Sequence, residues 1–215
     1  MNRTLLPILL GGVLLLALYY LLPRSAPTHN PTPIPSAKKP ETRRETEAFA
    51  LKLKGRAREV KSYARRKGFS TEHCFLIDMS LPSGKNRFFI YDLKRDSVVA
   101  AGLVAHGSCN TVFLRNARFS NTPNCGCSSV GRYKVGYKYK GRFGRAYKLH
   151  GLDSTNSNAF RRAVVLHAYD CIPDREVYPL PACNSLGCPM VSYAFLDKAA
   201  KVIDRAKRPI LLWVY

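Results

Sequence analysis

The chain has 215 residues and a formal net charge of +21 at pH 7, and 46% of its residues are apolar. That apolar share includes 12 Tyr and 10 Phe, so the chain can fill a core, which excludes a fully disordered or collagen-like protein. The length fits one domain with appendages, and the excess positive charge favours partners that carry phosphate or carboxylate groups. Seven cysteines are too few for a fold built wholly from disulfides, and their odd number needs an explanation.

The first 25 residues differ from the rest of the chain. Residues 5–22 are uncharged and rich in leucine, and a helix of that length spans about 27 Å, close to the hydrocarbon thickness of a bilayer. Tyr19 and Tyr20 near its far end are typical of a membrane interface. We predict an uncleaved signal-anchor over 1–25. A cleaved signal peptide is the alternative, although Arg24 stands where cleavage needs a small residue.

The orientation of this segment involves a conflict. Five basic residues follow the apolar stretch, and a count of positive charges places that side in the cytoplasm: Arg24, Lys38, Lys39, Arg43 and Arg44. Long domains translocate largely regardless of such charge, however, and the cysteine content favours an oxidising compartment. We therefore expect the body of the protein to be extracytoplasmic.

A spacer and a helix come next. Residues 26–40 contain five prolines, which predicts a semi-extended linker. The segment 41–72 is predicted to contain an amphipathic helix that spans 41–67 and ends at Gly68. Its many Lys and Arg side chains indicate a solvated face, with contact to anionic lipid head groups as the alternative. Apolar residues recur along it every three or four positions: Phe49, Leu53, Ala57, Val60 and Ala64.

The remainder of the chain, 73–215, has the pattern of a mainly β body. Short apolar runs separated by turn-forming residues predict strands over 74–79, 88–92, 97–106, 132–140, 144–149, 163–167 and 210–215. Residues 193–205 are predicted to be helical, because Phe195, Ala199 and Ile203 share one face. The fold class is therefore mainly β, with a leading helix and one late helix.

Basic and aromatic residues alternate over 132–140. Tyr133, Val135, Tyr137 and Tyr139 fall on one face, and lysines fall on the other. Interleaved basic and aromatic residues also occur in nucleic-acid grooves. A strict period of two is equally typical of a sheet that packs aromatics on one face. We favour the structural interpretation and expect no nucleic-acid partner.

One cysteine stands apart from the others. Cys188 follows Gly187, and glycine lets the backbone bend so that N–H groups converge beside the sulfur as an oxyanion hole. A nucleophilic thiol needs a base nearby, and His167, at the end of a predicted strand, is the best candidate. From residue chemistry alone, a disulfide or buried thiol for Cys188 and a core position for His167 remain alternatives.

These residues and their surroundings resemble the YkuD-type L,D-transpeptidase catalytic domain. The family motif is a His followed further along the chain by Ser/Thr-x-Gly-Cys, here His167 and Ser185-Leu186-Gly187-Cys188. Leu186 stands where many members carry His, and Pro189-Met190 also departs from the common pattern. Further segments resemble the murein branch of the family in chain order over 74–215: residues 104–107, 119–123, 128–133, 149–152, 156–159 and 162–167.

The resemblance implies a β-sandwich or barrel-like catalytic domain over 73–215 that transfers acyl groups on peptidoglycan stem peptides. Cys188 would form a thioester with loss of D-alanine, and an amine of a second stem would resolve it into a 3–3 cross-link. His167 would act as base and then as acid, oriented by the backbone carbonyl of Ala168. Backbone N–H groups near Leu186, Gly187 and Cys188 would hold the oxyanion.

The resemblance also implies a setting and a set of pocket residues. The implied location is the bacterial cell envelope, with a periplasmic catalytic domain anchored in the inner membrane, and no metal or organic cofactor is expected. The basic surface would attract the anionic wall polymer. Four residues are candidates for the substrate pocket: Ser185, His106, Gly107 and Tyr133.

The other six cysteines are predicted to form three disulfides, which would leave Cys188 as the single free thiol. Six cysteines allow fifteen pairings. We prefer Cys171–Cys183, which would close the loop that leads to the nucleophile. Neighbouring Cys125 and Cys127 are expected to pair elsewhere, with Cys109 near in sequence and Cys74 completing the set. The alternative is a zinc site that uses the two neighbours and a His.

Two other functions are compatible with these residues. Water could accept the acyl group, which would make the protein an L,D-carboxypeptidase or endopeptidase, because both reactions share the thioester. The protein could also be a non-enzymatic, basic envelope- or nucleic-acid-binding protein in which Cys188 is structural.

Overall fold

The computed structural model describes residues 43–215. The predicted signal-anchor (1–25), the proline-rich linker (26–40) and residues 41–42 of the predicted helix lie outside the described residues. Within residues 43–215, no helix is both long and apolar enough to cross a bilayer.

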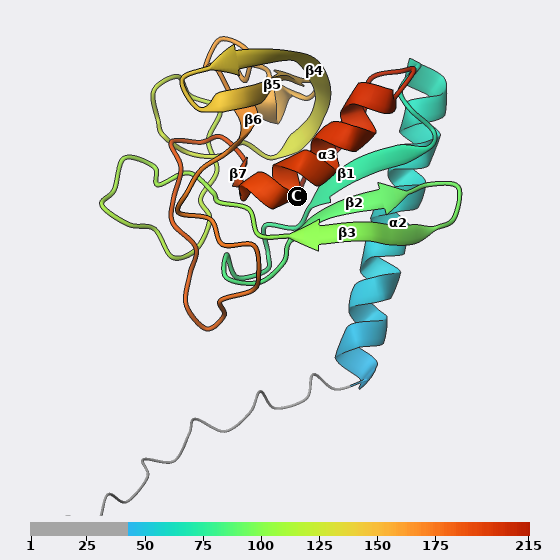
Figure 1. Cartoon of the computed structure of the whole chain (residues 1–215), viewed down its shortest axis with the longest axis horizontal. Helices are drawn as coiled ribbons and strands as arrows, with labels where there is room; N and C mark the ends of the chain where they lie inside the picture. Colours follow the sequence, from blue (N-terminus) through green and yellow to red (C-terminus); the bar gives the residue numbers. More distant parts are fainter. Residues whose placement is uncertain (1–42) are drawn as a thin grey trace, which may run out of the picture. The chain divides into compact units, whose positions relative to one another are not determined.

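The described chain forms one eight-stranded sheet with two long helices (Figure 1). The strands lie in the order β3-β2-β1-β8-β4-β5-β6-β7. The pairs β1–β8 and β6–β7 are parallel and the other neighbours are antiparallel. The elements are α2 (Arg43–Lys67), β1 (His73–Ile77), β2 (Phe88–Asp92), β3 (Ser97–Gly102), β4 (Gly131–Gly141), β5 (Gly144–Gly151), η1 (Ser154–Asn156), β6 (Val165–Ala168), β7 (Met190–Val191), α3 (Tyr193–Arg205) and β8 (Leu211–Val214).

The two helices cover opposite faces of the sheet. Successive side chains of a strand point to opposite faces, and on β1 this alternation separates two cores. Phe75 belongs to the core that includes Phe195 of α3. Its neighbour Leu76 belongs to the core that includes Leu53 of α2. The amphipathic helix is thus part of the same compact unit as the strands, which runs from residue 42 to residue 215.

The two edges of the sheet approach each other beyond β3. The amide of Ala105 donates a hydrogen bond to the carbonyl of Met190 on β7, and Gly107 forms an isolated parallel bridge with Ser185. The expected sandwich is therefore wrong, because the strands form a single sheet. The barrel-like description fits better, because the segment that follows edge strand β3 forms a hydrogen bond to the opposite edge strand, β7.

Most predicted elements are confirmed, with changed ends. The leading helix ends at Lys67, and Gly68 follows with a φ of +76°, as a helix C-terminus favours. The alternation on β4 is confirmed only as far as Val135. A register shift between Val135 and Lys138 interrupts it, and Tyr137 is 60% exposed. The two-residue strand β7 was not predicted.

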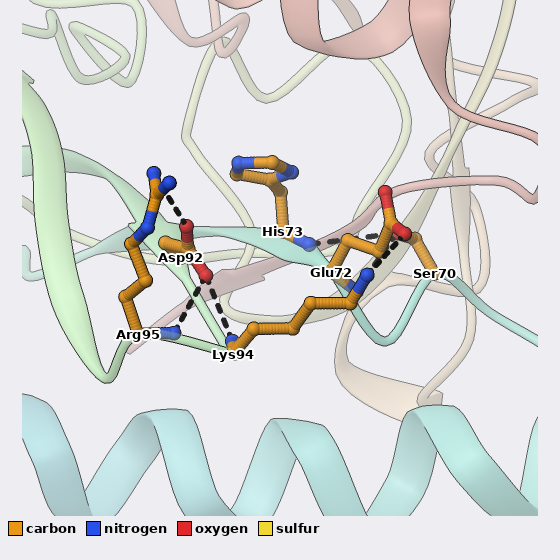
Figure 2. Close-up of polar contacts among 6 residues, drawn as sticks. All are labelled: Ser70, Glu72, His73, Asp92, Lys94 and Arg95. Atoms are coloured by element: carbon orange, nitrogen blue, oxygen red, sulfur yellow. Dashed lines mark hydrogen bonds and ion pairs between the residues drawn. The ribbon is translucent and has the colours of Figure 1, made fainter.

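Polar contacts fix the outer end of the β1–β2 pair, as Figure 2 shows. A carboxylate oxygen of Asp92 accepts hydrogen bonds from the amides of Lys94 and Arg95, both at 2.8 Å. The hydroxyl of Ser70 accepts from the amide of Glu72 at 3.3 Å. These short-range bonds satisfy backbone donors just before β1 and in the turn between β2 and β3.

Candidate active site

Strand pairing brings the two candidate catalytic residues onto one edge of the sheet. Cys188 precedes β7, and β7 runs parallel to β6 with His167 opposite Met190. The amide of Val165, also on β6, donates to the Cys188 sulfur at 3.4 Å. Val165 and His167 are two residues apart and so share a face, with about 6.5 Å between their Cα atoms. The sulfur therefore lies against the strand that carries the histidine.

His167 is held in one tautomer. Its Nδ1 lies 3.0 Å from the carbonyl oxygen of Ala168, and because a carbonyl only accepts, Nδ1 carries the proton. Nε2 is then free to take a proton. Burial lowers the pKa of His167, and the bond to Ala168 opposes that effect. The imidazole is therefore neutral at neutral pH, as a general base must be. The ring of Phe143 stacks on it at 4.3 Å between centroids.

The loop that carries Cys188 depends on glycine and on Ser185. Gly187 has a φ of +113°, and a Cβ there would lie 2.6 Å from the carbonyl oxygen of Cys127. Any larger residue is thus excluded by both backbone conformation and space. The Ser185 hydroxyl donates to the Cys188 carbonyl at 2.7 Å and accepts from the Gly187 amide at 3.1 Å.

These contacts revise the expected oxyanion hole. The Gly187 amide is engaged by Ser185, so it is not a free donor. Within residues 43–215, the amides of Leu186 and Cys188 donate to no protein acceptor. Leu186 is 79% exposed. The two amides that flank Gly187 are therefore the donors that remain for an oxyanion.

The four residues expected in the substrate pocket make hydrogen bonds inside the protein, and their contact with substrate stays a prediction. Each is buried and has its hydrogen bonds within the protein. The Tyr133 hydroxyl donates to the Ser129 carbonyl at 2.7 Å, and the Gly107 amide donates to the Ser128 hydroxyl at 3.0 Å. His106 is fully buried. Together with Ser185, these residues hold the loops around the nucleophile.

A buried arginine organises one of those loops. Arg87 is 1% exposed, and its guanidinium donates to the carbonyls of Val104 and Leu81 and contacts Nδ1 of His106 at 2.9 Å. Because Arg87 only donates, Nδ1 is the acceptor and Nε2–H donates to the Leu114 carbonyl at 2.9 Å. The Asn184 side chain contacts both the amide and the carbonyl of Leu114. This network of hydrogen bonds thus runs from Arg87 through His106 and Leu114 to Asn184, the residue before Ser185. Arg87 was not predicted from the sequence, because His106 and Val104, which it contacts, are 17 to 19 residues away along the chain.

The cysteines form two disulfides and not three. Cys109 is bonded to Cys127, and Cys171 is bonded to Cys183. The preferred pair, Cys171–Cys183, is therefore confirmed, and so is the expectation that Cys127 does not pair with Cys125. The third disulfide is wrong: Cys74 is a buried free thiol in the α2-facing core, and Cys125 is also free. The zinc alternative loses a ligand, because the Cys127 sulfur is in a disulfide.

Comparison with known proteins assigns the family. The family model described as an L,D-transpeptidase catalytic domain matches residues 42–215. The chain belongs to this family. The match includes α2 as well as the sheet, and it covers the His167 and Cys188 segments described above. No curated protein sequence matches.

Solved structures of L,D-transpeptidases are among those similar to this family member. An L,D-transpeptidase from Xylanimonas cellulosilytica has a TM-score of 0.39 and 16% identity, and the alignment covers 68% of this chain and 61% of that chain. The L,D-transpeptidase from Mycobacterium smegmatis gives 0.39 and 14%, over 67% and 58%. The helical cell shape determining protein Pgp2 from Campylobacter jejuni gives 0.41 and 14%, over 66% and 46%. This chain thus spans less than two thirds of each of these three proteins, and none of the three TM-scores reaches 0.5. The family assignment therefore rests on the family model.

Proposed function

We propose that this protein is a cysteine-dependent L,D-transpeptidase that joins peptidoglycan stem peptides through 3–3 cross-links. The observation that carries the proposal is the pairing of β6 with β7, which sets the Cys188 sulfur beside Val165, on the strand that holds His167. Nucleophilic cysteine chemistry needs a neutral base near the thiol, and the strand that borders the Cys188 sulfur carries such an imidazole.

The first half-reaction forms a thioester. Nε2 of His167 takes the proton of the Cys188 thiol, and the sulfur bonds to the carbonyl carbon of the third residue of the donor stem. The amides of Leu186 and Cys188 donate to the oxyanion that develops. The C–N bond to the terminal D-alanine then breaks, and His167 returns its proton to the leaving amine.

The second half-reaction resolves the thioester. A side-chain amine of a second stem gives a proton to His167 and attacks the thioester carbonyl. The C–S bond breaks, the sulfur recovers the proton from His167, and a new amide bond joins the two stems. If water took the place of the amine, the same steps would shorten the donor stem, which is the hydrolytic alternative.

We also propose that the catalytic domain lies in the periplasm, anchored in the inner membrane by residues 1–25. Support comes from the length and apolar character of residues 5–22 and from the two disulfides, which persist in oxidising compartments.

The test is incubation of the purified protein with muropeptides that carry tetrapeptide stems, followed by mass spectrometry. We expect dimers with the mass of two stems minus one D-alanine. Cys188→Ala should abolish the dimers, whereas Cys125→Ala, which removes the other thiol that is not fully buried, should retain them. Shortened monomers alone would establish the hydrolytic alternative. Unchanged muropeptides, or dimers that persist in Cys188→Ala, would refute the proposal.

A further inference from the structure

Arg162 lies against the loop that carries the nucleophile. One nitrogen of its guanidinium is 3.1 Å from where a Cβ of Gly187 would be, so the group packs on the residue directly before Cys188. The two backbone groups near the sulfur follow Arg162 in sequence: the Ala163 carbonyl at 4.0 Å and the Val165 amide at 3.4 Å. Ala163 has a φ of 55°, a left-handed conformation that is costly for a residue with a Cβ and that is enriched at functional sites.

We propose that Arg162 is the fixed cation that stabilises the thiolate form of Cys188. The inference rests on the proposed function only in taking Cys188 as the nucleophile. It assigns to Arg162 a supporting role that is separate from the proton transfer by His167.

The guanidinium is immobilised without being neutralised. It donates to the Ser120 carbonyl at 2.9 Å and also to the Ser129 hydroxyl and the Cys127 carbonyl. None of these three acceptors is a carboxylate, so the positive charge is not cancelled by its hydrogen-bond partners. The Cys109–Cys127 disulfide fixes the loop that supplies one of them. A rigid, uncompensated cation in a partly buried site acts more strongly on a neighbouring anion than a mobile surface charge does.

Of the other titratable groups near Cys188, two are neutral and one is a cation. Burial lowers the pKa of His167, so its imidazole is neutral and can accept a proton but holds no standing charge. Burial raises the pKa of Tyr133 to about 12, so its hydroxyl is also neutral. The Lys148 amine is the second cation, and it lies over the rings of Tyr139 and Phe160.

The Cys188 thiol needs a nearby positive charge in order to ionise. Burial raises the pKa of Cys188, and the Val165 amide, Arg162 and Lys148 act in the opposite direction. The thiolate is the nucleophile, so its population at neutral pH limits the first half-reaction. Arg162 therefore offsets part of the effect of burial where the sulfur must ionise.

The experiment measures how fast iodoacetamide alkylates Cys188 as a function of pH, by mass spectrometry of its peptide, in a Cys125→Ala background. No peptidoglycan is needed, so the result is independent of whether the muropeptide assay succeeds. We expect Arg162→Gln to move the midpoint of the pH–rate profile upward by about one pH unit, which corresponds to about tenfold slower alkylation at neutral pH. Arg161→Gln is the matched control, because this neighbouring arginine is exposed and should leave the profile unchanged.

A charge-conserving variant separates electrostatics from folding. Arg162→Lys retains the cation and should keep the midpoint close to that of the wild type, with the fold checked by circular dichroism. It also decides the question if Arg162→Gln does not fold. A folded Arg162→Lys protein with a midpoint a full unit higher, an unchanged profile in folded Arg162→Gln, or an equal shift in Arg161→Gln would each overturn the proposal.

Discussion

Replacing His106 by glutamine should remove part of the protein's sensitivity to acid. His106 is fully buried, with Nδ1 accepting from Arg87 and Nε2–H donating to the Leu114 carbonyl. A glutamine amide has one acceptor and one donor end, so it can keep the same two kinds of hydrogen bond without titrating. The neutral state of His106, rather than its shape, is therefore the property under test.

The expected magnitude follows from the pKa of His106. Burial, and secondarily the charge of Arg87, lower this pKa from 6.5 to about 4. In the unfolded chain the imidazole binds a proton near pH 6.5, whereas the folded chain resists protonation until about pH 4. Stability is then complete above the unfolded value and is lost as the pH falls through this window. At about 1.4 kcal/mol per pKa unit, the loss attributable to His106 is about 3 kcal/mol.

The assay is urea unfolding of the wild type and of His106→Gln at several pH values between 7 and 4. The free energy of unfolding of the wild type should fall more steeply than that of the variant, by about 3 kcal/mol over the whole window. His167 and His150 also have pKa values lowered chiefly by burial, so both proteins lose some stability in acid. Parallel curves for the two proteins would refute the assignment of a buried, neutral His106.

Three further predictions concern packing and cysteine reactivity. Gly107→Ala should destabilise the protein by about 1–3 kcal/mol, because its Cβ would lie 2.2 Å from the backbone carbonyl oxygen of Gly126. Gly55→Ala should stabilise it by up to about 1 kcal/mol, because glycine is unfavourable inside a helix and open space surrounds that position. Urea midpoints measure both, and a stabilising Gly107→Ala would contradict the close packing. In the native, unreduced protein, iodoacetamide should modify Cys125 and Cys188, and should reach the buried Cys74 only after denaturation; native labelling of Cys74 would contradict its place in the core.

The spacing of apolar residues along the chain was sufficient to predict most of the helices and strands. The apolar spacing from Phe49 to Ala64 predicts a helix because burial of one helical face needs that spacing, and α2 buries Leu53, Ala57, Val60 and Ala64. Alternating or continuous apolar runs located β1, β2, β4 and β5 for a similar reason. The two residues of β7 were missed because so short a strand has no period, and it exists only through its parallel pairing with β6.

In the candidate site too, some features could be predicted from the sequence and others required the tertiary structure. The residue types and their order in the chain pointed to His167 and Cys188, since the chemistry of a thiol nucleophile restricts which side chains serve it, and the family resemblance implied the carbonyl of Ala168. Only the tertiary structure decided that His106 and Tyr133 are buried supports, that the Gly187 amide is engaged by Ser185, and that Cys74 is unpaired. It also placed Arg162 beside Gly187. Each of these depends on contacts between segments remote in sequence, and side-chain burial and hydrogen-bond partners across such distances have no local signature.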